Sequence, residues 1–404
     1  MRCKALSVWA LGRSMDCLLH IGTDKTGTTS IQKFLHLNRQ RLGRRGILFT
    51  RSCGEINNHF LAVAAYDLGQ RDDLTANLSL RTNHDLEVYQ QLLKARLRRE
   101  LREAGTPRVV FSSEHLQSRL KEVPQITRLR RFLSDAGIRK TKVIVYLRDP
   151  ADLAFSLHST SVKGGHPGTG PCSPDSEDGT GYDPAYFRNV CDHRATIQRW
   201  GGVFGMENII PRLFRCDQFV QGDLLRDFIA TAQLPALPYD FPKPHNEALD
   251  HLGLELMRRF NAHVPAFVDG APNPLRGQVW SLFEKYFTSC ERQPQSLQIR
   301  QAYEVAFAEG NEWVRQRFFP ELPALFEPRP AGPDATQLLP PGQWLDQCAA
   351  MVAELWLEVR KNALKNREEE PAPSRILPIS LGRVRRTVSS MLRKVGVLPK
   401  SRAA

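Results

Sequence analysis

The sequence predicts an α/β fold: a P-loop-containing, nucleotide-binding-like parallel sheet flanked by helices, with a largely helical C-terminal part. Short apolar runs alternate with helical patterns up to about residue 215. One of these runs, 143–147, is apolar throughout, as a strand covered on both faces should be. A turn rich in Gly and Thr separates the first run from the first helical pattern. Strands and helices that alternate in this way imply βαβ units and a parallel sheet.

Five strands are expected, and helical patterns separate them. The first helix has an apolar stripe that includes Ile31 and Phe34, a charged helix is expected over about 85–103, and another over about 344–365. After about Pro244 the chain looks mostly helical. The strands are predicted at 18–21, 46–49, 109–111, 143–147 and 209–214.

Breaks in composition suggest three parts. We expect one α/β domain over 15–330, a linker with a C-terminal helix over 331–370, and a basic tail over 371–404, because 328–341 is rich in Pro and a Glu-Pro break follows Glu368. The segment 164–181, rich in Gly, Pro and Ser, is expected to be a mobile loop or lid inside the first domain.

Bulk composition narrows the class of protein. Apolar residues make up 41% of the 404 residues, which allows an ordinary core, and no apolar run approaches the roughly 18 residues that cross a bilayer. The first 11 residues show no clear secretory signal. The eight cysteines form no CxxC pair or metal-like cluster, which predicts reduced thiols and a cytoplasmic protein.

The net charge of +13 favours anionic partners, and much of it lies in the tail. From Pro373 onward there are eight basic residues and no acidic one, so the body is mildly basic and no nucleic-acid partner is expected. Leu381, Val388 and Leu392 fall on one helical stripe flanked by arginines. The tail is therefore either a basic amphipathic helix in peripheral contact with an anionic membrane, at its inner face, or a solvated segment.

A phosphate-binding loop is predicted between Gly22 and Thr29. The run GTDKTGTT is close to GxxxxGK[ST], in which backbone N–H groups hold phosphates at a helix N-terminus. Thr28 stands where a nucleoside triphosphatase has its Lys, and the positive charge sits inside the loop at Lys25. Such a loop suits a single 5′-phosphate without metal. The alternative is a plain Gly-rich turn with Thr caps.

A second anion site is predicted after the fourth strand. Arg148 follows that strand, where the carboxyl end of a parallel sheet faces the ligand crevice, and Ser156 lies two helical turns further on. A guanidinium fork with a hydroxyl suits a terminal phosphate. The alternative is an ion pair of Arg148 with Asp149 or Asp152 that serves the helix start.

Two residues are candidates for a general base. Glu114 follows the third strand, at the same sheet edge as the loop, and His59 follows the second strand. Their alternatives are a carboxylate that stabilises a helix N-terminus and an ordinary polar residue at a helix start. His20 is expected to be packed, Trp200 to belong to the core, and Arg212 to line a cleft or form a surface ion pair.

Together the two motifs resemble the sulfotransferases that depend on 3′-phosphoadenosine 5′-phosphosulfate (PAPS). Lys25 to Thr29 is similar to their 5′-phosphosulfate loop, and Arg148 with Ser156 to their 3′-phosphate motif. The run 20–32 is similar to bacterial carbohydrate-type members. The resemblance is strong over 17–38 and 141–160, looser over 183–215 and absent in the tail. Asp24 departs from the residue more frequent at its position.

The resemblance implies an enzyme that transfers a sulfuryl group from PAPS to a hydroxyl or amine acceptor by in-line displacement. Adenosine 3′,5′-bisphosphate (PAP) would leave, no metal would be needed, and the acceptor would be a carbohydrate or glycolipid. Lys25 and a base, Glu114 or His59, would be catalytic. The donor would be held by Lys25, Thr26, Gly27, Thr28, Thr29, Arg148 and Ser156.

Two other functions stay open at this stage. One is a P-loop kinase that uses ATP, although the Lys after Gly27 is missing. The other is a non-catalytic protein of the same fold that binds an anionic ligand or a membrane.

Overall fold

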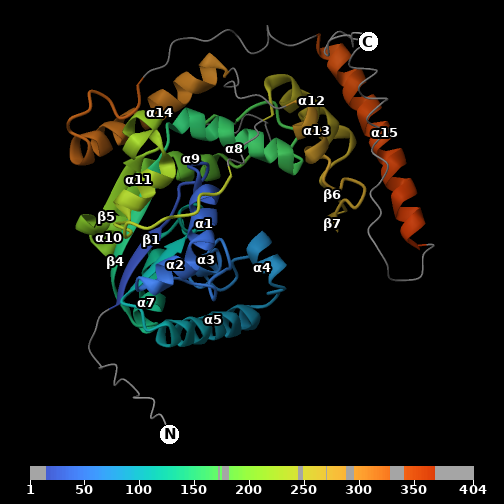
Figure 1. Ribbon diagram of the computed structural model, residues 1–404. Helices are drawn as coiled ribbons and strands as arrows, with labels where there is room; N and C mark the ends of the chain where they lie inside the picture. The colour runs from blue at the N-terminus through green and yellow to red at the C-terminus, as the bar shows by residue number, and fades with distance from the viewer. Residues whose placement is uncertain are drawn as a thin grey trace. The chain divides into compact units, whose positions relative to one another are not determined.

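The computed structural model describes residues 15–171, 173–174, 182–243, 249–269, 271–287, 295–327 and 341–368 (Figure 1). The chain divides into two compact units. The first comprises Met1–Leu157, Cys172–His245 and Gln298–Pro330, and the second His158–Pro171, Asn246–Leu297 and Ala331–Ala404. The basic tail, most of the expected linker, the first 11 residues and much of the expected lid lie outside the described residues, and the predicted domain boundaries stay predictions.

The first unit contains a five-stranded sheet with the strand order β2-β3-β1-β4-β5. Each neighbouring pair is parallel, with Leu18 opposite Val110 on one side and Lys142 on the other. The prediction of a parallel α/β sheet is therefore confirmed. The strands are β1 (Met15–His20), β2 (Ile47–Phe49), β3 (Arg108–Ser112), β4 (Ile138–Leu147) and β5 (Ile209–Leu213).

The strand β4 begins five residues before the predicted run 143–147. Its first half carries Arg139, Lys140 and Lys142, which are exposed, and only its second half is continuously buried. Apolar runs locate the buried part of a strand, so the solvated part was missed.

Alternate residues of the central strands enter two separate cores, as the period of two requires. Leu18, Val110 and Ile144 pack with α1 and α11 on one face. Leu19, Phe111 and other residues pack on the opposite face with α5, α7 and α10. These helices are α1 (Thr28–Leu37), α5 (Asn83–Ala104), α7 (Val123–Asp135), α10 (His193–Phe204) and α11 (Leu224–Thr231).

Shorter helices complete the first unit. Some of them follow a strand at its carboxyl end, which is the sheet edge at which ligands bind in open α/β sheets, and others lead into the next strand. The remaining elements are α2 (Arg39–Arg44), α3 (Phe60–Val63), α4 (Asp73–Asn77), α6 (His115–Arg119), α9 (Pro184–Cys191), η1 (Met206–Asn208), η2 (Cys216–Gln218) and η3 (Val220–Gly222). Nearly all of α14 (Leu297–Phe318) also belongs to this unit, and the unit boundary divides α8 (Pro150–Gly164) after Leu157.

The described residues of the second unit are mostly helical, as predicted. Phe260, Phe283 and Leu345 form part of its core, and the Trp356 indole N–H donates to the Leu275 carbonyl at 2.9 Å. A small antiparallel pair, β6 with β7, was not predicted, because two-residue strands leave no periodic pattern. The elements are α12 (His251–His263), β6 (Phe267–Val268), β7 (Ala271–Pro272), α13 (Trp280–Tyr286) and α15 (Gly342–Glu368). Of the helices in the described ranges, none has the length and apolarity needed to cross a membrane.

Candidate functional site

The loop after β1 is held tightly against β4. Thr23 donates its N–H to the Tyr146 carbonyl at 3.1 Å, and Tyr146 donates to the Gly22 carbonyl at 2.7 Å. The Thr26 hydroxyl then closes the loop with a bond to the Thr23 carbonyl at 2.7 Å. Gly22 has a φ of 103°, and a side chain there would place its Cβ 3.1 Å from the Glu114 Cα. A glycine is therefore required where the loop passes the end of β3.

The loop ends in the first turn of α1. Gly27, with a φ of 72°, is the N-cap residue, and no side chain caps the helix. The alternative of a turn with Thr caps is therefore wrong in that respect: Thr28 is the first helical residue and is buried, and Thr29 is exposed. The backbone of 27–29 forms the positive end of the helix dipole, which suits a phosphate.

Arg148 lies beside this loop. Its Nη1 donates to the Lys25 carbonyl at 2.8 Å, and its Cζ lies 5.7 Å from the centre of the Phe214 ring. The structure thus brings together the two predicted anion-binding motifs, although 123 residues separate Lys25 from Arg148.

The carboxylates that follow Arg148 are engaged by another cation. Arg300 forms ion pairs with Asp149 at 3.4 Å and with Asp152 at 2.5 Å. Asp149 also accepts the Asp152 N–H at 2.9 Å and so serves the start of α8. Ser156 is half-buried on that helix, two turns after Arg148.

Glu114 lies between two amide donors at the end of β3. Gln32 donates to its Oε2 at 2.6 Å, and Asn57 donates to its two carboxylate oxygens at 3.1 and 3.2 Å. The close approach of Gly22 to the Glu114 backbone places this residue against the loop. Glu114 is the N-cap residue of the short helix α6, and its side chain makes no capping hydrogen bond there. The alternative of a carboxylate that stabilises this helix N-terminus stays a prediction.

His59 lies in the same group of side chains. Its Nδ1 bonds to the Asn57 carbonyl at 2.9 Å, and because a carbonyl only accepts, Nδ1 carries the proton and Nε2 the lone pair. Burial lowers the pKa of His59 from its usual value, so the ring is neutral at neutral pH. The same residue, Asn57, therefore links His59 to Glu114.

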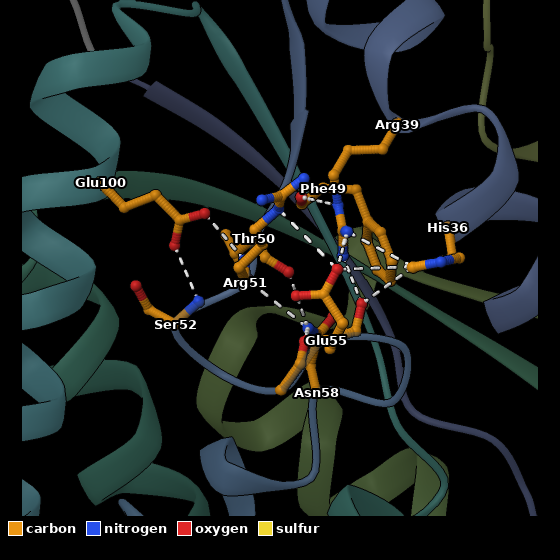
Figure 2. Close-up of polar contacts among 10 residues, drawn as sticks. His36, Arg39, Phe49, Thr50, Arg51, Ser52, Glu55, Asn58 and Glu100 are labelled. Atoms are coloured by element: carbon orange, nitrogen blue, oxygen red, sulfur yellow. Dashed lines mark hydrogen bonds and ion pairs between the residues drawn. The ribbon is translucent and has the colours of Figure 1, made fainter.

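The segment that carries Asn57 and His59 is fixed by a polar cluster at the end of β2 (Figure 2). Arg39 donates to the Phe49 carbonyl at 3.1 Å and pairs with Glu55, and Glu100 accepts the N–H groups of Arg51 and Ser52 at 2.7 and 2.9 Å. These contacts hold the segment 50–58 at the sheet edge. The buried Asn58 then joins it to β3, because its side chain accepts the Ser112 N–H at 3.0 Å.

Asp24, which departs from the resemblance, lines a cleft beside the loop. The Tyr186 hydroxyl donates to its Oδ2 at 3.1 Å, and both side chains line a cleft of about 590 Å³ with His115, Ser118 and Arg119. Burial and the nearby Glu114 raise the pKa of Asp24 to about 6. The carboxylate therefore belongs to the cleft beside the loop.

The change Asp24→Asn should stabilise the protein above pH 6. Because the pKa of Asp24 is raised from 3.8 to about 6 in the folded state, the folded protein binds this proton more tightly, and stability falls as the pH rises from about 4 to 6. The amide of the variant does not ionise, so we expect the melting temperature of Asp24→Asn to equal that of the wild type at pH 4 and to exceed it by about 2–4 °C at pH 7.5. Calorimetric scans across this range measure the difference. A constant difference at all pH values would contradict the expectation.

The structure also shows the surroundings of three further residues for which the sequence allowed an expectation. Trp200 is 1% exposed and stacks on Phe204, so its assignment to the core is confirmed. His20 is fully buried, bonds to the Ser112 hydroxyl at 2.8 Å, and has its pKa lowered to about 3 by burial. Arg212 pairs with the buried Asp227, which also accepts the Tyr146 hydroxyl at 2.8 Å.

Sequence reasoning missed Gln32, Asn57, Tyr186 and His193. The His193 Nε2 donates to the Arg148 carbonyl at 2.7 Å, and burial lowers the pKa of His193 to about 4. The only signal in the sequence was that Gln32 and Asn57 lie in segments next to predicted motifs. In the part of the chain that the structure describes, no group of three or more His, Cys, Asp or Glu side chains could hold a metal ion.

No family model matches the chain. An uncharacterized protein of Archaeoglobus fulgidus is 27% identical over 148 residues, which are 35% of this chain and 35% of that protein. The match thus spans about a third of that relative's length. The crystal structure of a sulfotransferase from Alicyclobacillus acidocaldarius is 20% identical, with a TM-score of 0.35, and the similarity covers 66% of this chain and 94% of the other.

Proposed function

We propose that the protein transfers a sulfuryl group from PAPS to a hydroxyl acceptor. The observation that carries the proposal is the bond from Arg148 to the Lys25 carbonyl, because it brings the residues of the two predicted anion sites next to each other. A nucleotide with phosphates at both its 5′ and 3′ positions needs two such sites. Lys25 and the backbone of 27–29 would hold the 5′-phosphosulfate, and Arg148 with Ser156 the 3′-phosphate.

The chemical step would be an in-line displacement at sulfur. The acceptor oxygen forms a new S–O bond while the S–O bond to the 5′-phosphate breaks, and PAP leaves with the electron pair of that bond. Lys25 would neutralise the charge that develops on the bridging oxygen. The acceptor's proton would pass to a base.

Glu114 is the base that we favour. It lies against the loop at Gly22, and it is close enough to Asp24 to raise that residue's pKa together with burial. Gln32 and Asn57 would orient its carboxylate. His59 is the alternative base, since it is neutral at neutral pH and has a lone pair on Nε2.

Calorimetric titration of the full-length protein tests the donor. In the presence of EDTA we expect PAP to bind with micromolar or lower Kd, about −8 kcal/mol. AMP, which lacks the 3′-phosphate, should bind at least ~10-fold more weakly, because it loses one charge-assisted contact. ATP with Mg²⁺ should bind more weakly than PAP.

The other outcomes decide between the remaining functions. Preference for ATP with Mg²⁺ would indicate a kinase. If PAP and AMP bound with equal affinity, the assignment of Arg148 as a ligand of the 3′-phosphate would be wrong. Binding of none of the nucleotides would leave a non-catalytic protein that binds an anionic ligand or a membrane.

A further inference from the structure

A polar cleft opens beside the loop within the first unit. It encloses about 590 Å³ and is lined by Asp24 of the loop, Tyr186 of α9, His115 and Ser118 of α6, and side chains between Arg119 and Gln125. Small-molecule sites have volumes of roughly 300–1,000 Å³. Because Asp24 is the neighbour of Lys25 in the chain, a molecule in this cleft would lie next to the sulfuryl donor of the proposed function.

The charges of the cleft do not favour an anion. Three carboxylates line it, those of Asp24, Asp72 and Glu122, against the two cations Arg119 and Lys121. Arg119 forms ion pairs with Asp72 and Asp73, each at 2.7 Å, so two carboxylates already compensate its charge. An acidic sugar would therefore find little positive charge to bind.

The position of Asp24 also disfavours a negatively charged ligand in the cleft. Burial and, after it, repulsion by the Glu114 carboxylate raise the pKa of Asp24, so a negative charge is already disfavoured at this position. A carboxylate or sulfate on the acceptor would bring a third negative charge to the same partly buried place. Such repulsion costs more in a partly buried cleft than in bulk water.

The other lining side chains suit neutral hydroxyl groups. Gln70, Gln125, Ser118 and Tyr186 each both donate and accept hydrogen bonds, as sugar hydroxyls do. Three carboxylates against two cations leave a small excess of negative charge in the lining, so it attracts a protonated amine only weakly.

We propose that this cleft takes the acceptor, that the acceptor is an uncharged polyhydroxyl compound, and that Asp24 and Tyr186 position its reacting hydroxyl. The inference rests on the proposed sulfuryl transfer and deepens it. Asp24 would accept a hydrogen bond from the acceptor and repel anionic analogues, which makes it a positioning and specificity-determining residue.

Binding to an oligosaccharide array tests the inference without turnover. The full-length protein, saturated with PAP, is applied to uncharged oligosaccharides and to their carboxylated, sulfated and amino counterparts. We expect the preferred uncharged compound to bind at least ~10-fold more tightly than its carboxylated counterpart, and Asp24→Asn to reduce that ratio to about 3 or less. Asp135→Asn is the matched control, because Asp135 is an exposed partner of Lys94 outside the cleft, and its ratio should equal that of the wild type.

The outcomes separate this inference from the proposed function. If PAP binds but anionic or amino compounds are preferred, or no compound binds, the inference is overturned and the donor assignment stands. An unchanged ratio in Asp24→Asn would also overturn it. If PAP fails to bind in the preceding titration, the proposed function itself is overturned.

Discussion

The change Glu114→Gln should lower kcat for sulfuryl transfer by a factor of about 10²–10⁴, the usual contribution of a general base. The amide has the shape of the carboxylate but cannot take the acceptor's proton. Gln32 and Asn57 would still find an oxygen acceptor at this position, so the local fold should persist. PAP affinity should stay within about threefold of the wild type, because Glu114 is not assigned to the donor. Stopped or continuous assays of PAP release give kcat, and calorimetry gives the affinity.

A matched control separates this effect from a general loss of a carboxylate. Glu309 is exposed on α14 and pairs with Arg194, so Glu309→Gln should leave kcat unchanged. His59→Asn tests the alternative base. If His59→Asn abolishes turnover and Glu114→Gln costs less than about tenfold, the assignment passes to His59. In that case the loss of activity on the acid side should follow the lowered pKa of His59 in the wild type.

The change Lys25→Ala should reduce kcat by about 10²–10³, because it removes the charge that stabilises the leaving oxygen in the transition state.

The change Arg148→Lys should affect donor binding more than kcat. It keeps a positive charge but loses the planar fork, so we expect PAP to bind about tenfold or more weakly, with a smaller change in kcat. Steady-state kinetics with PAPS, together with PAP titrations of both variants, resolve these two effects.

Lys140→Ala is the control for the change at Lys25. Lys140 is exposed in the first half of β4, away from the carboxyl edge of the sheet, so its loss should alter neither parameter. If Lys25→Ala weakened PAP binding and left kcat of the saturated enzyme unchanged, Lys25 would be a ligand of the donor and not a catalytic residue. If Arg148→Lys bound PAP as tightly as the wild type, the 3′-phosphate assignment would be wrong.

The sequence by itself determined the local features of the site. Apolar runs of three to six residues, separated by helical periodicity, are typical of a covered parallel sheet, and all five predicted strands are present. The loop could be recognised from its glycines. Gly22 and Gly27 both have positive φ angles, and Gly22 also passes close to the backbone of Glu114. Glycine meets these requirements best, and they concern single positions of the chain, so they leave a mark in the sequence. Lys25, Glu114 and Arg148 could be placed at one edge of the sheet because each follows a strand, and the carboxyl ends of parallel strands meet at the edge where open α/β sheets bind ligands.

Only the tertiary structure decided which side chains meet. The contacts of Glu114 with Gln32 and Asn57 span 82 and 57 residues, and that of Tyr186 with Asp24 spans 162. No sequence period relates such pairs, because they depend on how helices and loops fold over the sheet edge. For the same reason the sequence could not show that Asp24, which looked unfavourable beside a phosphosulfate, lines a cleft with Tyr186. The raised pKa of Asp24 arises from burial and from Glu114, two properties that exist only after the chain has folded.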